Sequence, residues 1–300
     1  MTKLQMFERN TGLNALLDRP RPSAGQLFLA QPCVFLASKL YAWHQVIPFQ
    51  PISPVRVVCI SDTHNSQPEI PAGEILIQAG DLTQSGTLKE LQTALDWLNS
   101  LPHRKKIVVA GNHDSLLDMG HPNADASAIR WGDIIYLNNE SVTLDCSGGR
   151  ELKVYGSPLS PQHGFWAFQY PRTQDVWRGR VPLDTDILIT HAPPKAHLDL
   201  ARLGCSFLLE ELWRTKPRLH VFGHVHAGHG REWIQFDGLQ RAYEETVIAG
   251  GGVWNLGLVV YQSFVAWFTP PIEAKTILVN ASMIGGLRDD ERRRPVTVDL

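Results

Sequence analysis

The feature that most constrains this sequence is a series of short apolar segments that each end in glycine or polar residues. Segments rich in β-branched residues lie at 55–60, 75–79, 107–110 and 187–189, and a fifth apolar segment lies at 219–222. Short runs bounded in this way predict buried parallel strands. We therefore expect an α/β fold.

Each apolar segment is followed directly by side chains that can bind metal ions. The motifs are Asp62-Thr63-His64, Gly80-Asp81, Gly111-Asn112-His113-Asp114, Thr190-His191 and Gly223-His224-Val225-His226. Any one of them alone is more often a turn, since Asn and Asp are ordinary turn residues. Ligands gather at the carboxyl ends of parallel strands, however, so all five motifs can meet at one edge.

The motifs together supply more donors than a single metal site requires. The seven oxygen or nitrogen donors are Asp62, His64, Asp81, Asn112, His191, His224 and His226. A tetrahedral zinc site needs four ligands. Two ions roughly 3.5–4 Å apart can use seven ligands if one carboxylate bridges them, and we expect Asp81 to be that bridge.

The order of the five motifs resembles that of the calcineurin-like metallophosphoesterase superfamily. Further stretches resemble its metallophosphoesterase-domain (MPPED-type) branch, the class III-like cyclic nucleotide phosphodiesterases; they lie at 138–141, 154–158, 191–194 and 217–224. The resemblance covers about residues 55–231 and resumes near 276–282. It implies two sheets packed as a β-sandwich and flanked by helices.

The resemblance also implies how the ligands divide between two ions. One ion would be held by Asp62, His64, Asp81 and His226, and the other by Asp81, Asn112, His191 and His224. Oxygen and nitrogen donors without thiolates suit Mn, Fe, Zn or Mg, of which we favour Mn. Two such ions lower the pKa of a bridging water from 15.7 to about 7 or below and direct the resulting hydroxide at phosphorus.

The expected general acid is His113, beside the ligand Asn112, with Asp114 orienting it and keeping it protonated. A supporting histidine without a catalytic role is the alternative. Candidates for contact with the leaving group follow Pro158; they are His163, Phe165, Trp166 and Phe168. A packed aromatic loop is an equally good interpretation of these four residues.

The expected substrate is a small phosphodiester such as a cyclic nucleotide. Protein phosphatases of the superfamily carry an arginine shortly after Gly-Asp to bind a phosphomonoester dianion, whereas Gly80-Asp81 is followed by no arginine through Gly86. The alternatives are a phosphomonoesterase, a nuclease or a non-catalytic scaffold. A net charge of −2 opposes binding of a nucleic-acid polymer. The complete set of ligands opposes the scaffold.

The chain length suits one large domain with appendages. We expect an N-terminal arm at 1–54 and the metallophosphoesterase domain at 55–300. The four scattered cysteines form no disulfide pattern, and no secretory signal is visible, so a reducing cytoplasmic setting is expected. Helices are predicted at 87–100, which begins with a capping box, and at 207–216. Short strands at 134–137, 142–144 and 152–155, around a turn at 147–149, fit the second sheet.

An insertion at about 233–275 separates the last motif from the final strands. Residues 247–269 carry no charge and many aromatic side chains. We expect a helical excursion that buries its apolar face against the apolar part of the arm at 27–49. A homo-oligomeric contact or peripheral association with a membrane are the alternatives.

Overall fold

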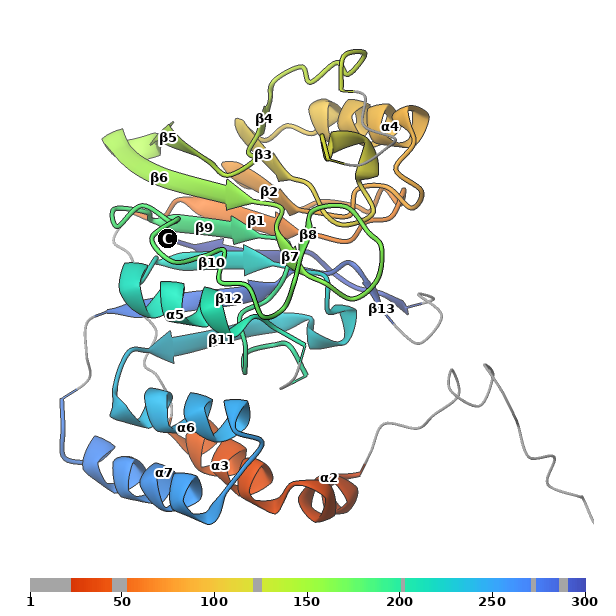
Figure 1. Cartoon of the computed structure of the whole chain (residues 1–300). Coiled ribbons are helices and arrows are strands. Elements are labelled where there is room, and N and C mark those ends of the chain that lie inside the picture. Colours follow the sequence, from red (N-terminus) through yellow and green to blue (C-terminus); the bar gives the residue numbers. More distant parts are fainter. Residues whose placement is uncertain (1–22, 45–52, 121–125, 201–202, 271–273, 286–290) are drawn as a thin grey trace, which may run out of the picture.

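Two β-sheets pack face to face, with helices on their outer faces (Figure 1). The computed structural model describes residues 23–44, 53–120, 126–200, 203–270, 274–285 and 291–300. The expected α/β sandwich of two sheets flanked by helices is confirmed. Of the expected arm, residues 1–22 and 45–52 lie outside the described residues.

The first sheet has five strands and is parallel except at one edge. Its order is β15 (Val296–Asp299), β1 (Arg56–Ile60), β2 (Ile75–Ala79), β3 (Lys105–Val109) and β4 (Ile134–Tyr136). Only β15 runs antiparallel to its neighbour. Alternate side chains face opposite sides, so Val57 packs between the sheets and Val58 packs on the outer face.

The second sheet has six strands. Its order is β11 (Gly230–Gln235), β12 (Lys275–Asn280), β10 (Leu219–Phe222), β9 (Ile187–Thr190), β6 (Arg150–Ser157) and β5 (Glu140–Cys146). The four central strands are parallel, and the two edge strands are antiparallel. Ile189 and Val221 face the first sheet and close the shared core.

The two predicted helices cover the outer faces of the sheets. Helix α4 (Leu88–Ser100) begins at a capping box formed by Thr87 and Glu90, and its apolar stripe packs on the first sheet. Helix α5 (Ser206–Thr215) buries Leu208 and Leu212 against the second sheet. Both predictions are confirmed.

One predicted strand belongs to the other sheet. The segment expected at 134–137 forms β4, which pairs in parallel with β3 in the first sheet. The segments at 142–144 and 152–155 do lie in the second sheet, as β5 and β6. A short apolar run shows that a strand exists, but its sheet is decided by long-range packing, here of Ile134 beneath α4.

Small elements complete the sheet ends. Two short strand pairs are β7 (Ser160–Pro161) with β8 (Gln169–Tyr170), and β13 (Ile284–Gly285) with β14 (Glu291–Arg292). Single 3₁₀ turns are η1 (Ser115–Leu117), η2 (Ser147–Gly149) and η3 (His226–Gly228).

Four helices form a layer beyond β11 at one end of the molecule (Figure 1). They are α2 (Ala24–Ala30), α3 (Pro32–Trp43), α6 (Gly238–Ile248) and α7 (Val253–Ala266). Ala37, Tyr243 and Val259 belong to the common core of α3, α6 and α7, and α2 packs beside α3. The helical segment thus packs against the arm, as expected. The 233–235 part of the predicted insertion lies in β11, so the helical excursion begins after that strand.

The described helices include none whose length and apolarity would let it cross a membrane.

Candidate metal centre

The seven predicted ligands lie on loops at the carboxyl ends of five parallel strands. Asp62, Asp81 and Asn112 follow β1, β2 and β3 of the first sheet, and His191 and His224 follow β9 and β10 of the second. His64 and His226 lie two residues beyond Asp62 and His224. The facing edges of the two sheets therefore bring together residues that are far apart in the sequence.

The backbone at the strand ends adopts an unusual conformation. Asp62, His64, Asp81 and His224 have positive φ angles of 51°, 40°, 51° and 65°. This region is unfavourable for residues other than glycine and is found mainly where function requires it. The turns are held by hydrogen bonds, in which the Asp62 and His64 N–H groups donate to the carbonyls of Gly80 and Asp81 over 2.9 and 3.1 Å.

Glycine is required beside the ligands because the loops approach each other closely. A Cβ atom at position 223 would overlap the Asp62 carboxylate and the Ser61 side chain. The Gly223-His224 turn can therefore lie directly against Asp62. The His224 N–H donates to the Asp62 carboxylate, 3.0 Å from Oδ2.

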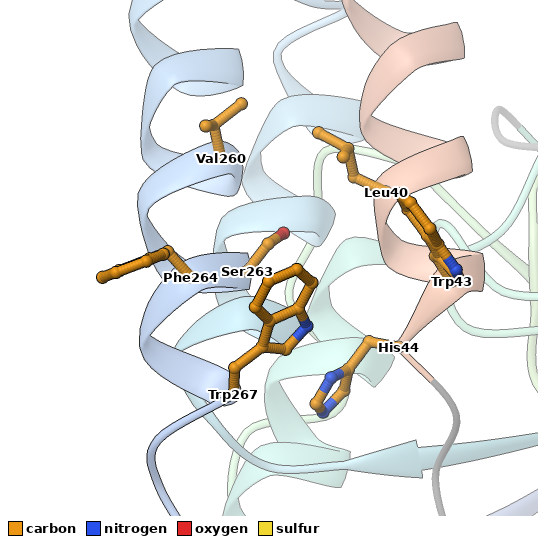
Figure 2. A pocket seen from close by; sticks show the side chains of 7 residues that line it. All are labelled: Leu40, Trp43, His44, Val260, Ser263, Phe264 and Trp267. Carbon is orange, nitrogen blue, oxygen red and sulfur yellow. The ribbon is translucent and has the colours of Figure 1, made fainter.

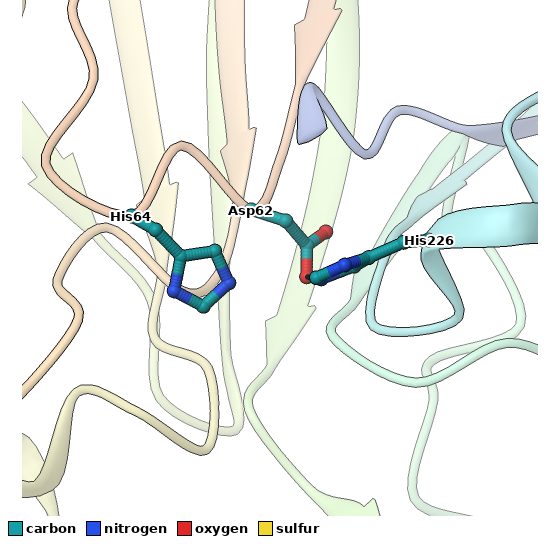
Figure 3. Close-up of side chains that lie close together, drawn as sticks. All are labelled: Asp62, His64 and His226. Carbon is teal, nitrogen blue, oxygen red and sulfur yellow. Dashed lines mark ion pairs between the residues drawn. The ribbon is translucent and has the colours of Figure 1, made fainter. Parts of the chain in front are cut away.

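The first group of donors contains Asp62, His64 and His226 (Figure 3). Nε2 of His226 lies 3.2 Å from Oδ1 of Asp62. Both ring nitrogens of His64 are buried, and neither has a hydrogen-bond partner among the described residues. An unpaired buried imidazole is costly unless it serves as a ligand, so this geometry fits a divalent ion.

The second group contains Asp81, His191 and His224, with Asn112 beside them. Nδ1 of His191 lies 3.0 Å from the Ala79 carbonyl, and a hydrogen bond there places a proton on Nδ1 and directs Nε2 inward. Nε2 of His191 lies 3.0 Å from Oδ1 of Asn112 and 3.4 Å from Oδ2 of Asp81.

Asp81 lies between the two groups. Its Oδ2 atom is 3.4 Å from Nε2 of His191 and 3.7 Å from Nε2 of His64. Its Oδ1 atom accepts the N–H of His113 over 2.8 Å. One carboxylate therefore faces donors of both groups, which is the position that a bridging ligand needs.

The protonation states are those of a cation-binding cluster. Burial would raise the pKa of Asp62, but the hydrogen bond and charge of His226 hold it well below its usual range. Burial likewise opposes the effect of His191 on Asp81, yet the pKa of Asp81 falls to about 2. Burial and the positive charge of His191 lower the pKa of His224 to about 3. Ionised carboxylates and a neutral imidazole are the forms that bind metals.

When no ion is bound, His191 carries the compensating positive charge, and a bound ion would take the place of its Nε2 proton. Burial lowers the pKa of His191, but the nearby Asp81 carboxylate outweighs burial and raises the pKa to about 9. The buried carboxylates thus attract a cation, which is also what a divalent ion would supply.

The ring of His113 faces the centre. The expectation that Asp114 orients this ring is wrong, because other groups contact it. Its Nδ1 atom lies 2.8 Å from the carbonyl of Gln84, and the ring stacks on Trp166 with centroids 4.4 Å apart. It also meets the edge of His64 at 4.7 Å.

The Asp114 carboxylate points instead into the neighbouring loop. It accepts the N–H groups of Leu82, Thr83 and Gly111 over 3.2, 3.0 and 2.8 Å, and the Thr83 hydroxyl over 2.8 Å. Burial and the Asp81 charge raise the pKa of Asp114 to about 6. The hydrogen bonds of Asp114 join the Gly80-Asp81 loop to the loop at 111–114.

The four predicted substrate contacts separate into different environments. The His163 ring meets His224 edge to face at 4.6 Å, and Trp166 is 46% exposed beside His113. Phe165 is fully exposed. Phe168 is buried in the core beneath α4, so the expectation that it contacts the substrate is wrong. The loop is anchored by a 3.3 Å hydrogen bond from Ala167 N–H to the carbonyl of Asn112.

Ser282 also belongs to the site, although it is not among the residues predicted from the motifs. Its hydroxyl donates to Oδ2 of Asp62 over 2.9 Å and thereby orients a predicted ligand. Ser282 follows β12, a parallel strand, just as the other motifs follow their strands. The same rule could therefore have found it. The guanidinium of Arg293 contacts the carbonyl of His226. Arg293 does not follow a parallel strand, so this rule could not have found it.

Comparison with known proteins shows a match to one protein family and to several relatives. Residues 55–228 match the family model described as Calcineurin-like phosphoesterase. The chain is similar to metallophosphoesterase domain-containing protein 1 of Homo sapiens, with 37% identity over 206 residues that cover 58% of this chain and 61% of that protein. It is also similar to "Probable rhamnogalacturonate lyase C" of Emericella nidulans, with 49% identity over 255 residues that cover 82% of this chain and 24% of that protein.

The chain therefore spans less than two thirds of the length of either relative. Among solved structures, the crystal structure of TT1561 of Thermus thermophilus is similar with a TM-score of 0.45 and 13% identity. That likeness covers 82% of this chain and 99% of the other.

Proposed function

The chain belongs to the calcineurin-like phosphoesterase family, and on that premise we propose that it hydrolyses a small phosphodiester, such as a cyclic nucleotide, with two divalent ions. Membership of this family supports the assignment of the chain as a metal-dependent hydrolase of phosphoric esters. The observation that carries the proposal is the position of Asp81 between two groups of donors. The preference for a diester over a monoester is more specific than family membership and rests on the residues discussed below.

The residues that would hold the ions are those that lie together at the facing edges of the two sheets. Asp62, His64 and His226 would hold one ion, and His191, His224 and Asn112 the other, with Asp81 shared. Two ions bound there would supply an activated water and offset the charge on the phosphoryl oxygens. These oxygen and nitrogen donors suit Mn, Fe, Zn or Mg, and of these we propose Mn.

His113 would donate the proton that the leaving oxygen needs. In the imidazolium form, Nδ1–H stays on the Gln84 carbonyl, and Nε2–H is the proton available for transfer. Stacking on Trp166 limits the tilt of the ring. The hydrogen bond from the His113 backbone to Asp81 ties the position of the acid to the shared ligand.

The preference for a diester is supported by the residues that follow Asp81. They are Leu82, Thr83, Gln84, Ser85 and Gly86, and none carries the guanidinium with which related phosphatases bind a monoester dianion. A diester monoanion needs less positive charge. His163 and Trp166 are the proposed contacts for the leaving group at the rim of the centre.

The net charge, the donor set and the cysteines bear on the alternative functions and on the cellular setting. A net charge of −2 disfavours a nucleic-acid polymer as the substrate. The complete donor set disfavours a scaffold without activity. All four cysteines are free thiols, which supports the proposed cytoplasmic setting.

The proposal is tested by the hydrolysis of a substrate panel with the manganese-loaded chain. The panel holds an aryl phosphodiester, an aryl phosphomonoester, 2′,3′- and 3′,5′-cyclic nucleotides and a single-stranded oligonucleotide. We expect the diesters to be hydrolysed with higher kcat/KM than the monoester. The Asp81→Asn variant, purified in parallel, controls for contaminating activity. Preferred hydrolysis of the monoester would replace the diester proposal, preferred hydrolysis of the oligonucleotide would replace the small diester by a polymer, and no hydrolysis of any substrate in the panel would favour the scaffold.

A further inference from the structure

Three helices of the helical layer, α2, α3 and α7, expose many apolar side chains. Among the described residues, most of the exposed large apolar side chains lie on α2, α3, α7 and the two residues after α7. The aromatic ones are prominent: Trp43 is 79% exposed, Trp254 89% and Trp267 73%. Exposed apolar patches of this kind mark an interaction surface.

Helix α7 is apolar on both its inner and its outer face. Val259 is buried against α3 and α6, and Leu256 and Ala266 pack beside it. Tyr261 and Phe264, on the outer face, are each 60% exposed. The outer face of a helix on a soluble domain is normally polar. The outer face of α7 therefore lacks the residues that would suit it to water.

The charge pattern favours lipid over a protein partner. Residues 247–269 contain no charged residue, and α2, α3 and α7 together contain no Asp or Glu and a single Lys, Lys39. Protein interfaces have a polar rim and about one hydrogen bond per 100–200 Å². A bilayer requires neither. It accommodates aromatic rings at the headgroup level and attracts cationic side chains through its anionic lipids.

A crevice between α3 and α7 opens on the same surface (Figure 2). Its volume is about 240 Å³, and it is lined mainly by apolar side chains, including Leu40, Trp43, Phe264 and Trp267. In Figure 2, Trp43 at the end of α3 and Trp267 directly after α7 lie on opposite sides of it. A crevice of this composition suits part of an acyl chain.

We propose that the outer surface of α2, α3 and α7 binds the surface of a lipid bilayer. Helix α7 has 14 residues and is about 21 Å long at 1.5 Å per residue, shorter than the roughly 30 Å hydrocarbon layer, so it lies in the plane of the interface. These helices lie beyond β11, away from the edge where the parallel strands end (Figure 1). The metal centre therefore stays open while the chain is bound.

The test is co-sedimentation of the full chain with vesicles of phosphatidylcholine, alone or mixed with phosphatidylserine. We expect the wild-type chain to sediment with the vesicles, and more strongly with the mixed ones because of Lys39. The double variant Phe264→Glu/Trp267→Glu should lose at least about tenfold in partition coefficient. Leu183→Glu, a change at a 69% exposed leucine outside these helices, is the matched control and should bind like wild type.

Three outcomes would overturn the proposal. The first is a wild-type chain that stays in the supernatant with both kinds of vesicle. The second is binding that the double variant retains in full. The third is a dimer, seen by sedimentation velocity and abolished by the double variant, that binds vesicles less well than the monomer does; it would assign the surface to a second copy. Both changes are at exposed positions, and circular dichroism checks that each variant is folded.

Discussion

The backbone N–H of His113 donates to Oδ1 of Asp81 over 2.8 Å. This bond leaves Oδ2 of Asp81 facing the imidazoles of His64 and His191, one from each donor group. The proposed acid and the proposed bridging ligand are therefore held by one contact. A change at Asp81 should disturb both ion sites and the position of His113.

Asp81→Asn should remove nearly all hydrolysis. The amide keeps an oxygen that can accept the His113 N–H, but it loses the negative charge that both ions require. We expect a loss of about 10³-fold or more in kcat/KM and a fall in metal content at both sites, measured by elemental analysis. His226→Ala, which changes one group only, should lower the content towards one ion per chain. A wild-type chain that is fully active with one ion would contradict the two-ion proposal.

His113→Ala should keep both metals and slow poor leaving groups most. General acids contribute about 10²–10⁴-fold where the leaving oxygen needs a proton. We therefore expect a large loss with an alkyl diester and a much smaller loss with a nitrophenyl diester. Equal losses on the two substrates would show that His113 acts through position or charge and not through proton transfer.

Asp114→Ala should destabilise the fold. The carboxylate accepts hydrogen bonds from three buried backbone N–H groups and the Thr83 hydroxyl. An unsatisfied buried donor costs about 1–3 kcal/mol, so a loss of about 3 kcal/mol or more in the free energy of unfolding is expected. Urea denaturation of the metal-free chain measures it. Asp114→Asn, which retains one acceptor oxygen, should lose less. A stable Asp114→Ala chain with impaired proton transfer would instead support the direct action on His113 that the geometry does not show.

We propose that Tyr41 helps to hold α3, in the described part of the arm, against α6 and α7. Its ring stacks on Tyr243 at 4.2 Å with an interplanar angle of 5°, and its hydroxyl donates to Gln240 over 2.5 Å. Tyr41→Ala should cost about 2 kcal/mol or more in the free energy of unfolding. Tyr261→Ala removes an exposed tyrosine of α7 and should change it by no more than about 0.5 kcal/mol. Equal effects of the two changes would argue against this role of Tyr41.

The sequence predicted the parts of the site that follow a local rule. A polar residue directly after a buried parallel strand must lie at the carboxyl edge of the sheet, which is why Asp62 and His191 could be brought together in advance. Contacts that depend on the packing of separate loops could not be predicted in this way. The direction of the Asp114 carboxylate and the burial of Phe168 are decided by how two loops meet.

The last prediction concerns a buried ion cluster at the base of the helical layer. Nδ1 of His197 lies 3.2 Å from Oε1 of Glu232, and Nε2 lies 3.1 Å from Oε1 of Glu244. Burial lowers the pKa of His197, but Glu232 and Glu244 outweigh burial and raise it to about 10. The pKa in the unfolded chain is about 6.5, so the folded state binds the proton more tightly.

The stability from this proton should therefore be fully present below about pH 6.5 and lost as the pH rises through about 10. We expect His197→Gln to lower the free energy of unfolding by about 2 kcal/mol or more near pH 6, and the difference from wild type to shrink as the pH rises towards 10. Urea denaturation of both chains across this range measures the difference. Glu244→Gln can still accept the N–H of Trp213, which now donates to Glu244 over 2.6 Å, and it should weaken the same pH dependence because one of the two charges that hold the proton is removed. A difference between wild type and His197→Gln that stays constant with pH would mean that His197 acts there through packing alone.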